Sequence, residues 1–214
     1  MAVTNVSGNS APSAKPPPTR KQIEDIFYRR YGRALAAWAA IESILAMWFT
    51  WACNANDNSR YYLQEVFFSA RSFNGRLEML KAAFSTPIRD KPLIEFFSEA
   101  VKITEGYSSF RNILAHRVTM FHTGRVLLVE GNDVFFQKKN PITDRHLVIA
   151  TKNFIRLRRV WLMSLPAMVP RPLLTPKEGL ERIRALPALA HSNELSRNQR
   201  GRLRQRAVQQ RSRG

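Results

Sequence analysis

Apolar residues that recur every three or four positions are the feature that most constrains the fold of this chain. Such spacing places side chains on one face of an α-helix. Three long segments show it, at residues 23–55, at residues 61–84 and from residue 90 onward. The stripe of the first segment comprises Phe27, Tyr31, Leu35, Trp38, Ile41, Leu45 and Trp48. Three long amphipathic helices with short links predict a helical bundle.

Helix boundary signals support this prediction. Asp90 is a suitable N-cap for the third helix, with Pro92 in its first turn. The apolar stripe of that helix comprises Leu93, Phe96, Ala100, Ile103, Tyr107, Phe110 and Leu114. A fourth helix is expected at residues 152–168, and Thr175 with Glu178 has the form of a capping box that begins a short helix to about Leu186.

Between the third and fourth helices the pattern changes to that of β-strands. Arg125–Glu130 and Val134–Gln137 flank a Gly-Asn-Asp turn and predict a β-hairpin, and Leu147–Ala150 has the composition of a third short strand. We therefore expect a mainly α fold, a four- to five-helix bundle with a small β-hairpin insertion before the last bundle helix.

Charge divides the chain into three parts. The net charge is +18, of which residues 1–21 contribute +3 and residues 171–214 contribute +8. We expect residues 1–21 to form a disordered arm, residues 22–170 the bundle, and residues 171–214 a basic tail with a short helix. A basic field of this kind indicates contact with a polyanion, such as nucleic acid or an acidic membrane surface, although an Arg-rich tail can also serve solubility alone.

Several classes of protein are disfavoured. The single cysteine, Cys53, excludes an intramolecular disulfide framework, and the scattered histidines predict neither a metal site nor a cofactor. The N-terminal residues lack the apolar core of a secretory signal. Residues 34–52 are almost continuously apolar, but Glu42 lies at their centre, which favours a buried bundle helix over a membrane span.

The most informative motif is Arg111-Asn112-Ile113-Leu114-Ala115-His116, near the end of the third helix. At about 100° per residue, Asn112 and His116 fall in a polar stripe almost opposite the apolar one. His116 is therefore expected outside the core, where an ordinary solvated polar face is the alternative interpretation. Arg111 lies about 140° from His116 on the helix, so a long side chain or a second copy of the chain must bring them together.

This hexapeptide resembles the signature of the HEPN family (higher eukaryote and prokaryote nucleotide-binding domains), in which an Arg precedes a His on a helix of a four- to five-helix bundle. The resemblance spans roughly residues 23–168, but only the hexapeptide is specific. Residues 117–122 and 184–191 also match the loose spacing, without the same helical context. The resemblance implies a homodimer in which both motifs line one cleft.

The resemblance also implies metal-independent cleavage of RNA, with Arg111, Asn112 and His116 as catalytic residues and a 2′,3′-cyclic phosphate product. Histidine is suited to proton transfer near neutral pH, and arginine to stabilising a phosphorane-like transition state. Asn112 would orient the imidazole or bind a phosphate oxygen.

Two functional hypotheses follow. The first is a cytoplasmic endoribonuclease, acting as a toxin or antiviral defence effector that an antitoxin or defence partner would control. The second is a non-catalytic dimeric bundle that binds nucleic acid or a partner protein through basic surfaces. In the first hypothesis the tail would contact RNA, and in the second its arginines would contact nucleic acid or a partner protein. Membrane binding is disfavoured because the tail has few bulky apolar residues. The RNA-binding residues expected in the tail are Arg197, Arg200, Arg202, Arg204 and Arg206.

Overall fold

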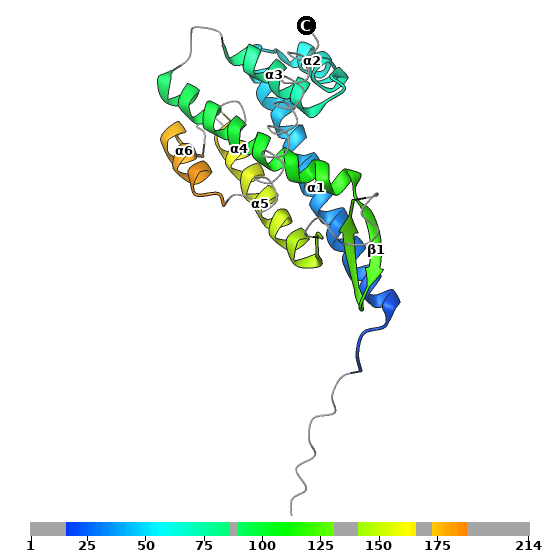
Figure 1. Cartoon of the computed structure of the whole chain (residues 1–214). Helices are drawn as coiled ribbons and strands as arrows, with labels where there is room; N and C mark the ends of the chain where they lie inside the picture. Colours follow the sequence, from blue (N-terminus) through cyan, green and yellow to red (C-terminus); the bar gives the residue numbers. More distant parts are fainter. Residues whose placement is uncertain (1–15, 86–89, 131–140, 166–172, 188–214) are drawn as a thin grey trace, which may run out of the picture.

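The structure is a computed structural model that describes residues 16–85, 90–130, 141–165 and 173–187. Within these residues it contains six helices and one two-stranded antiparallel sheet (Figure 1). The helices are α1 (Arg20–Ala52), α2 (Asp57–Ser69), α3 (Phe73–Phe84), α4 (Lys91–His116), α5 (Asp144–Met163) and α6 (Pro176–Arg184), and the strands are β1 (Val118–His122) and β2 (Arg125–Val129). The mainly helical fold with a small hairpin before α5 confirms the prediction.

The long helix α1 is the axis of the bundle. It begins at a capping box, in which Thr19 accepts a hydrogen bond from the backbone N–H of Gln22 and the Gln22 side chain accepts one from that of Thr19. Its apolar stripe packs most extensively against α5. Among the described residues, α1 has the length and composition of a membrane span, but half of its most apolar window is buried inside the structure, as in the core helix of a bundle.

The core is centred on aromatic side chains. Trp48 of α1 packs edge-on against Trp161 of α5, and its Nε1 donates a hydrogen bond to the Trp161 carbonyl oxygen at 3.0 Å. Trp161 Nε1 in turn donates to the buried hydroxyl of Thr104 on α4, also at 3.0 Å. These bonds satisfy both indole N–H groups without water and join three helices at one point.

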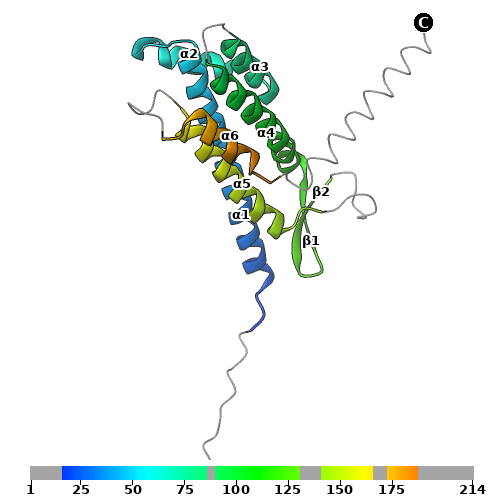
Figure 2. The ribbon, with the colours of Figure 1, turned by 90° about the vertical axis from the view of Figure 1, so that its left-hand side faces the viewer.

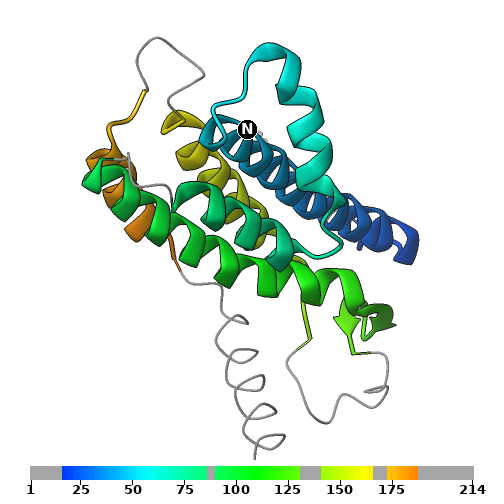
Figure 3. The ribbon, with the colours of Figure 1, turned by 90° about the horizontal axis from the view of Figure 1, so that it is seen from above.

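The smaller elements lie at the two ends of the bundle. Figures 1 and 3 show α2 and α3 beside the C-terminal half of α1. The hairpin lies at the other end, beside the start of α1, where Tyr28 and Thr119 share a hydrogen bond of 3.1 Å. α4 spans the distance between them, so its last turn lies next to the hairpin.

The single helix expected at residues 61–84 is instead two helices, and this prediction was wrong. Ala70 leaves the helical region (φ −62°, ψ 120°), and the Ser72 side chain accepts a hydrogen bond from the Gly75 backbone N–H at 3.0 Å. Ser72 therefore caps a new helix inside what looked like a continuous apolar stripe.

The described hairpin joins Arg125–Val129 to the segment before it, a pairing that the sequence did not lead us to expect. Arg125–Val129 is a strand, but it pairs with the preceding Val118–His122, with Met120 opposite Leu127. Thr123 and Gly124, both with positive φ (43° and 73°), form the tight turn between them. The other expected strand, Val134–Gln137, lies outside the described residues.

The last bundle helix starts earlier than expected. The residues predicted as a third strand, Leu147–Ala150, lie inside α5, which begins after the N-cap Thr143. Leu147 and Ala150 are both fully buried, and a short buried apolar run cannot be assigned to strand or helix by periodicity alone.

The short helix after the bundle is present and begins at the predicted capping box of Thr175 and Glu178. α6 packs against α4 and α5 (Figure 2), with Leu180 and Ile183 in the core. Part of the segment that we assigned to the tail therefore belongs to the packed body of the protein.

Candidate functional site

The hexapeptide occupies the last six residues of α4. The helix ends at His116, and Arg117 turns the chain into extended structure (φ −94°, ψ 147°) that leads to β1. The side chains of Asn112 and His116 are exposed, as the helical geometry predicts for both. His116 is therefore not a core histidine.

Arg111 is held in place by two contacts. Its Nη2 lies 3.9 Å from Glu42 Oε1 on α1, and its Nη1 donates a hydrogen bond to Asn112 Oδ1 at 3.3 Å. The side chain is 35% exposed, so the guanidinium keeps access to solvent. Because Asn112 lies one turn before His116, the arginine reaches toward the polar stripe that carries the histidine.

Glu42 is the centre of a polar cluster that the sequence did not lead us to expect. Its carboxylate, in a side chain only 13% exposed, accepts hydrogen bonds from Trp38 Nε1 and Arg76 Nη1, both at 2.6 Å. Arg76 also lies over the Phe68 ring, with its Cζ 5.2 Å from the ring centroid. The cluster joins α1, α3 and α4 and sets the position of Arg111.

One signal in the sequence could have identified this cluster. Glu42 is the sole charged residue in the apolar run from Ala34 to Ala52, and a carboxylate at such a place is rarely buried without a partner. An arginine from another helix was the natural partner to seek. The sequence does not show which arginine that is, because the contact depends on the separate orientation of α3.

The polar stripe of α4 comprises Glu105, Ser109, Asn112 and His116 and carries an ion pair at its N-terminal end. There Glu105 accepts a hydrogen bond from Lys81 of α3 at 2.6 Å, and this bond is the main cause that raises the pKa of Lys81. Ser109 is half-buried, and Asn112 and His116 are exposed. A ligand therefore has access to the stripe at its C-terminal end.

The other matches to the loose spacing differ in context. Arg117 precedes β1 and His122 ends it, and the Arg117 side chain is 8% exposed and lies 3.9 Å from Glu130. The pair Arg184 and His191 cannot be compared, because His191 lies outside the described residues. The tail arginines Arg197, Arg200, Arg202, Arg204 and Arg206 also lie outside them.

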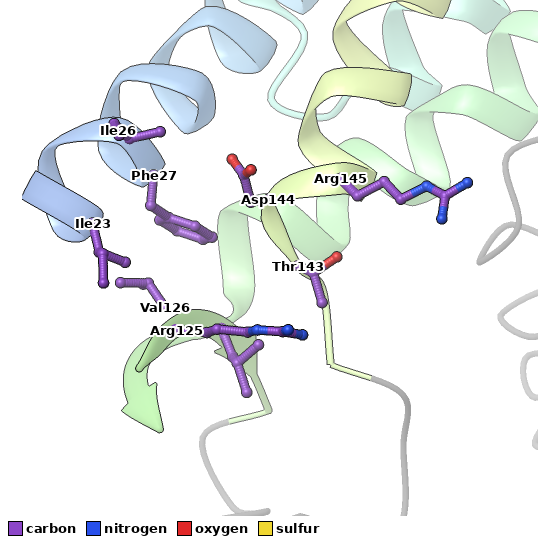
Figure 4. Close-up of a pocket in the computed structure, with 9 residues that line it drawn as sticks. Ile23, Ile26, Phe27, Arg125, Val126, Thr143, Asp144 and Arg145 are labelled. Atoms are coloured by element: carbon purple, nitrogen blue, oxygen red, sulfur yellow. The ribbon is translucent and has the colours of Figure 1, made fainter. Parts of the chain in front are cut away.

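A pocket of about 390 Å³ lies away from the hexapeptide, between the start of α1, β2 and the start of α5 (Figure 4). Its apolar wall includes Phe27 and Val126, and its polar wall includes Arg125, Asp144 and Arg145. Asp144 pairs with Arg30 of α1, while its Oδ1 is buried and has no hydrogen-bond partner among the described residues. The sequence did not predict this pocket, which depends on how three separate elements meet.

No group of three or more His, Cys, Asp or Glu side chains is arranged to hold a metal ion in the part of the chain that the structure describes. Comparison of the chain with protein families, with curated proteins and with solved structures finds no match. The chemistry of the residues themselves is therefore the basis for a functional proposal.

Proposed function

We propose that this chain is a metal-independent, HEPN-type endoribonuclease that acts in the cytoplasm as a homodimer. The observation that carries the proposal is the position of Arg111, which Glu42 and Asn112 hold beside the stripe that ends at the exposed His116. A fixed guanidinium and an accessible imidazole are the two groups that cleavage through the 2′-OH requires.

In the proposed reaction the ribose 2′-OH attacks the adjacent phosphorus, and the bond from phosphorus to O5′ breaks. One imidazole accepts the 2′-OH proton, while the leaving O5′ takes up a proton and becomes a 5′-hydroxyl. Arg111 stabilises the negative charge on the phosphorane-like transition state. The products are a 2′,3′-cyclic phosphate and a 5′-OH end. A dimer with two motifs in one cleft would supply a second His116 as the proton donor.

The end of the basic tail would add affinity for RNA without taking part in the chemistry, since residues 195–214 contain seven arginines and no acidic residue. A toxin or defence role, with a neutralising partner, is the biological setting in which we place this activity.

The direct test is incubation of structured RNA with purified wild-type protein, with and without EDTA. We expect cleavage that EDTA does not reduce, and product ends that carry a 2′,3′-cyclic phosphate. His116→Ala and Arg111→Ala should abolish it, while His122→Ala should retain it, because His122 is an exposed histidine outside the motif. Equal cleavage by wild type, His116→Ala and Arg111→Ala would refute the site.

The dimer is tested separately by light scattering at micromolar concentration. We expect twice the mass of one chain, with His116 close to the subunit interface. A monomeric mass together with cleavage that depends on His116 would refute the shared cleft and leave a single-chain site.

A second function is favoured by one observation. Arg111 belongs to an ion-pair cluster around the largely buried Glu42, which is also what a purely structural arginine would show. In that case the chain is a non-catalytic dimeric bundle that binds nucleic acid or a partner protein. RNA binding without cleavage by the wild-type protein would support this function.

A further inference from the structure

The exposed surface of α5 carries a concentration of positive charge. Five basic residues of this helix are exposed, namely Arg145, Lys152, Arg156, Arg158 and Arg159. Its single acidic residue, Asp144, is paired with Arg30 of α1. α5 therefore presents cations to solvent without acidic residues among them.

Four of these residues form a straight row. Arg145, Lys152, Arg156 and Arg159 follow one another at intervals of seven, four and three positions, which places them on one line along the helix. The row lies opposite the buried side chains of α5, such as Phe154 and Trp161. It extends over about 21 Å at 1.5 Å per residue. We call these four residues the basic ridge.

The basic ridge differs from the ion-paired surfaces among the described residues, such as those of Lys81–Glu105 at 2.6 Å and Arg184–Glu95 at 3.2 Å. Within the described residues, the structure shows no ion pair for any of the four ridge residues. Like charges three and four positions apart repel one another on a helix, so the row lacks a local role in stability.

We propose that the basic ridge binds the phosphodiester backbone of single-stranded nucleic acid, at a surface separate from Arg111 and His116. A linear row of cations without acidic neighbours neutralises successive phosphates and releases their counterions. A membrane surface fits less well, because a helix that lies on a bilayer must insert a continuous apolar face. Most apolar side chains of α5 are buried in the core, and its exposed ones, Ile149 and Ile155, are separated by basic residues.

The pocket of Figure 4 is the reason for assigning a single strand. Arg145 belongs both to the ridge and to the residues that line the pocket, and Figure 4 shows its guanidinium directed away from the apolar side chains. A strand that follows the ridge therefore reaches the pocket at its end. There the apolar side chains of Ile23, which is half-buried, and Ile26, which is exposed, offer a surface for an unstacked base. Bases in a duplex are stacked and cannot enter such a pocket without unpairing.

The test measures binding of the full chain to a 2′-O-methylated oligoribonucleotide, which lacks the free 2′-OH and so cannot be cut through it. The ridge variant carries Arg145→Gln, Lys152→Gln, Arg156→Gln and Arg159→Gln. The control variant carries Lys21→Gln, Arg71→Gln, Lys91→Gln and Lys177→Gln, which removes the same charge from exposed positions on other elements. A third variant with Arg145→Lys, Arg156→Lys and Arg159→Lys keeps the charge.

We expect the log–log slope of binding against salt to fall by about 0.7 for each phosphate that a variant no longer neutralises, and thus by up to about 2.8 in the ridge variant. The control and lysine variants should keep the wild-type slope, and all variants should keep the helical circular dichroism signal. Equal decreases in the ridge and control variants would overturn the proposal, because they would depend on net charge alone.

Two further arms complete the test. Equal affinity for a duplex of the same length would overturn the assignment to a single strand. If the ridge variant lost binding to phosphatidylserine vesicles but bound the oligonucleotide as wild type does, the proposal of a nucleic-acid surface would be overturned in favour of a membrane surface. Cleavage of saturating, unmodified RNA should be as fast in the ridge variant as in wild type. Failure of the ridge to bind is therefore distinguishable from failure of Arg111 and His116 to cleave.

Discussion

Glu42 binds two arginines unequally, and the difference predicts which of them stabilises the fold. Arg76 Nη1 donates to Glu42 Oε2 at 2.6 Å between side chains that are 19% and 13% exposed. Arg111 Nη2 lies 3.9 Å from Glu42 Oε1, and its side chain is 35% exposed. The first contact is a charge-assisted hydrogen bond, and the second is a longer, more solvated ion pair.

The structure sets the expected magnitudes. Replacing Arg76 by Met keeps the aliphatic part of the side chain and removes the bond to Glu42, at a cost of about 2 kcal/mol in the free energy of unfolding. We do not expect more, because Arg76 Nε is buried without a hydrogen-bond partner among the described residues. Arg111→Met should cost less than about 1 kcal/mol. At roughly 2–4 °C per kcal/mol for a chain of this size, the melting temperature should fall by about 4–8 °C and by less than about 4 °C, respectively.

The assay is urea unfolding of both variants, combined with Glu42→Gln in two double-mutant cycles. The coupling energy of Glu42 with Arg76 should exceed that of Glu42 with Arg111 by at least about 1 kcal/mol. If the two couplings are equal, Arg111 is a structural residue. The argument that it is available to bind phosphate would then fail.

Other predictions concern single positions. Gly179→Ala should destabilise the protein by about 1–3 kcal/mol in urea unfolding, because its Cβ would lie 2.7 Å from Ser164 Oγ and 2.9 Å from the Phe96 ring. Its matched control, Gly106→Ala, has no atom within 4 Å of the new Cβ and should stabilise α4 by about 0.5–1 kcal/mol; a loss of stability there would contradict the packing. Burial raises the pKa of Tyr107 to about 12, above its ordinary value of 10. The contribution of the neutral phenol to the free energy of unfolding should therefore be complete below pH 10 and lost between pH 10 and about 12. In the Tyr107→Phe variant this pH dependence should disappear from the unfolding free energy, and its persistence would refute the assignment. His116→Ala should change the unfolding free energy by less than about 0.5 kcal/mol because the side chain is exposed, and a loss of several kcal/mol would show a structural role.

The long helices were predictable because their apolar stripes are long, and the short helix α6 was predictable because its cap is local. Thr175 with Glu178 shows this for α6, since both partners of the capping box lie within one turn. The break between α2 and α3 was not predictable in the same way. A stripe of apolar residues continues through Ala70, and only the cap at Ser72 indicates a new helix.

The hairpin shows a second limit. The Gly-Asn-Asp sequence at residues 131–133 is a stronger local turn signal than Thr123-Gly124, and we therefore missed the pairing of Arg125–Val129 with the segment before it. Four of the five side chains of β2, from Val126 to Val129, are buried, so packing against the bundle contributes to strand pairing here.

For the candidate site, the sequence was informative about exposure and uninformative about partners. The helical phase of α4 was enough to place Asn112 and His116 outside the core. The anchoring of Arg111 by Glu42, the place of Arg76 and the pocket beside Arg145 all depend on contacts between helices far apart in the sequence. Such contacts follow from tertiary packing, which periodicity does not describe.

The docking of α6 has a consequence for the order in which the protein matures during synthesis. Five helices and the hairpin leave the ribosome before α6, whose Gly179 then packs against the Phe96 ring. Until that moment the face of α4 that receives Leu180 and Ile183 is an open apolar surface on an otherwise assembled bundle. An interval of this kind is when a nascent chain is most exposed to chaperones or to association with another nascent copy.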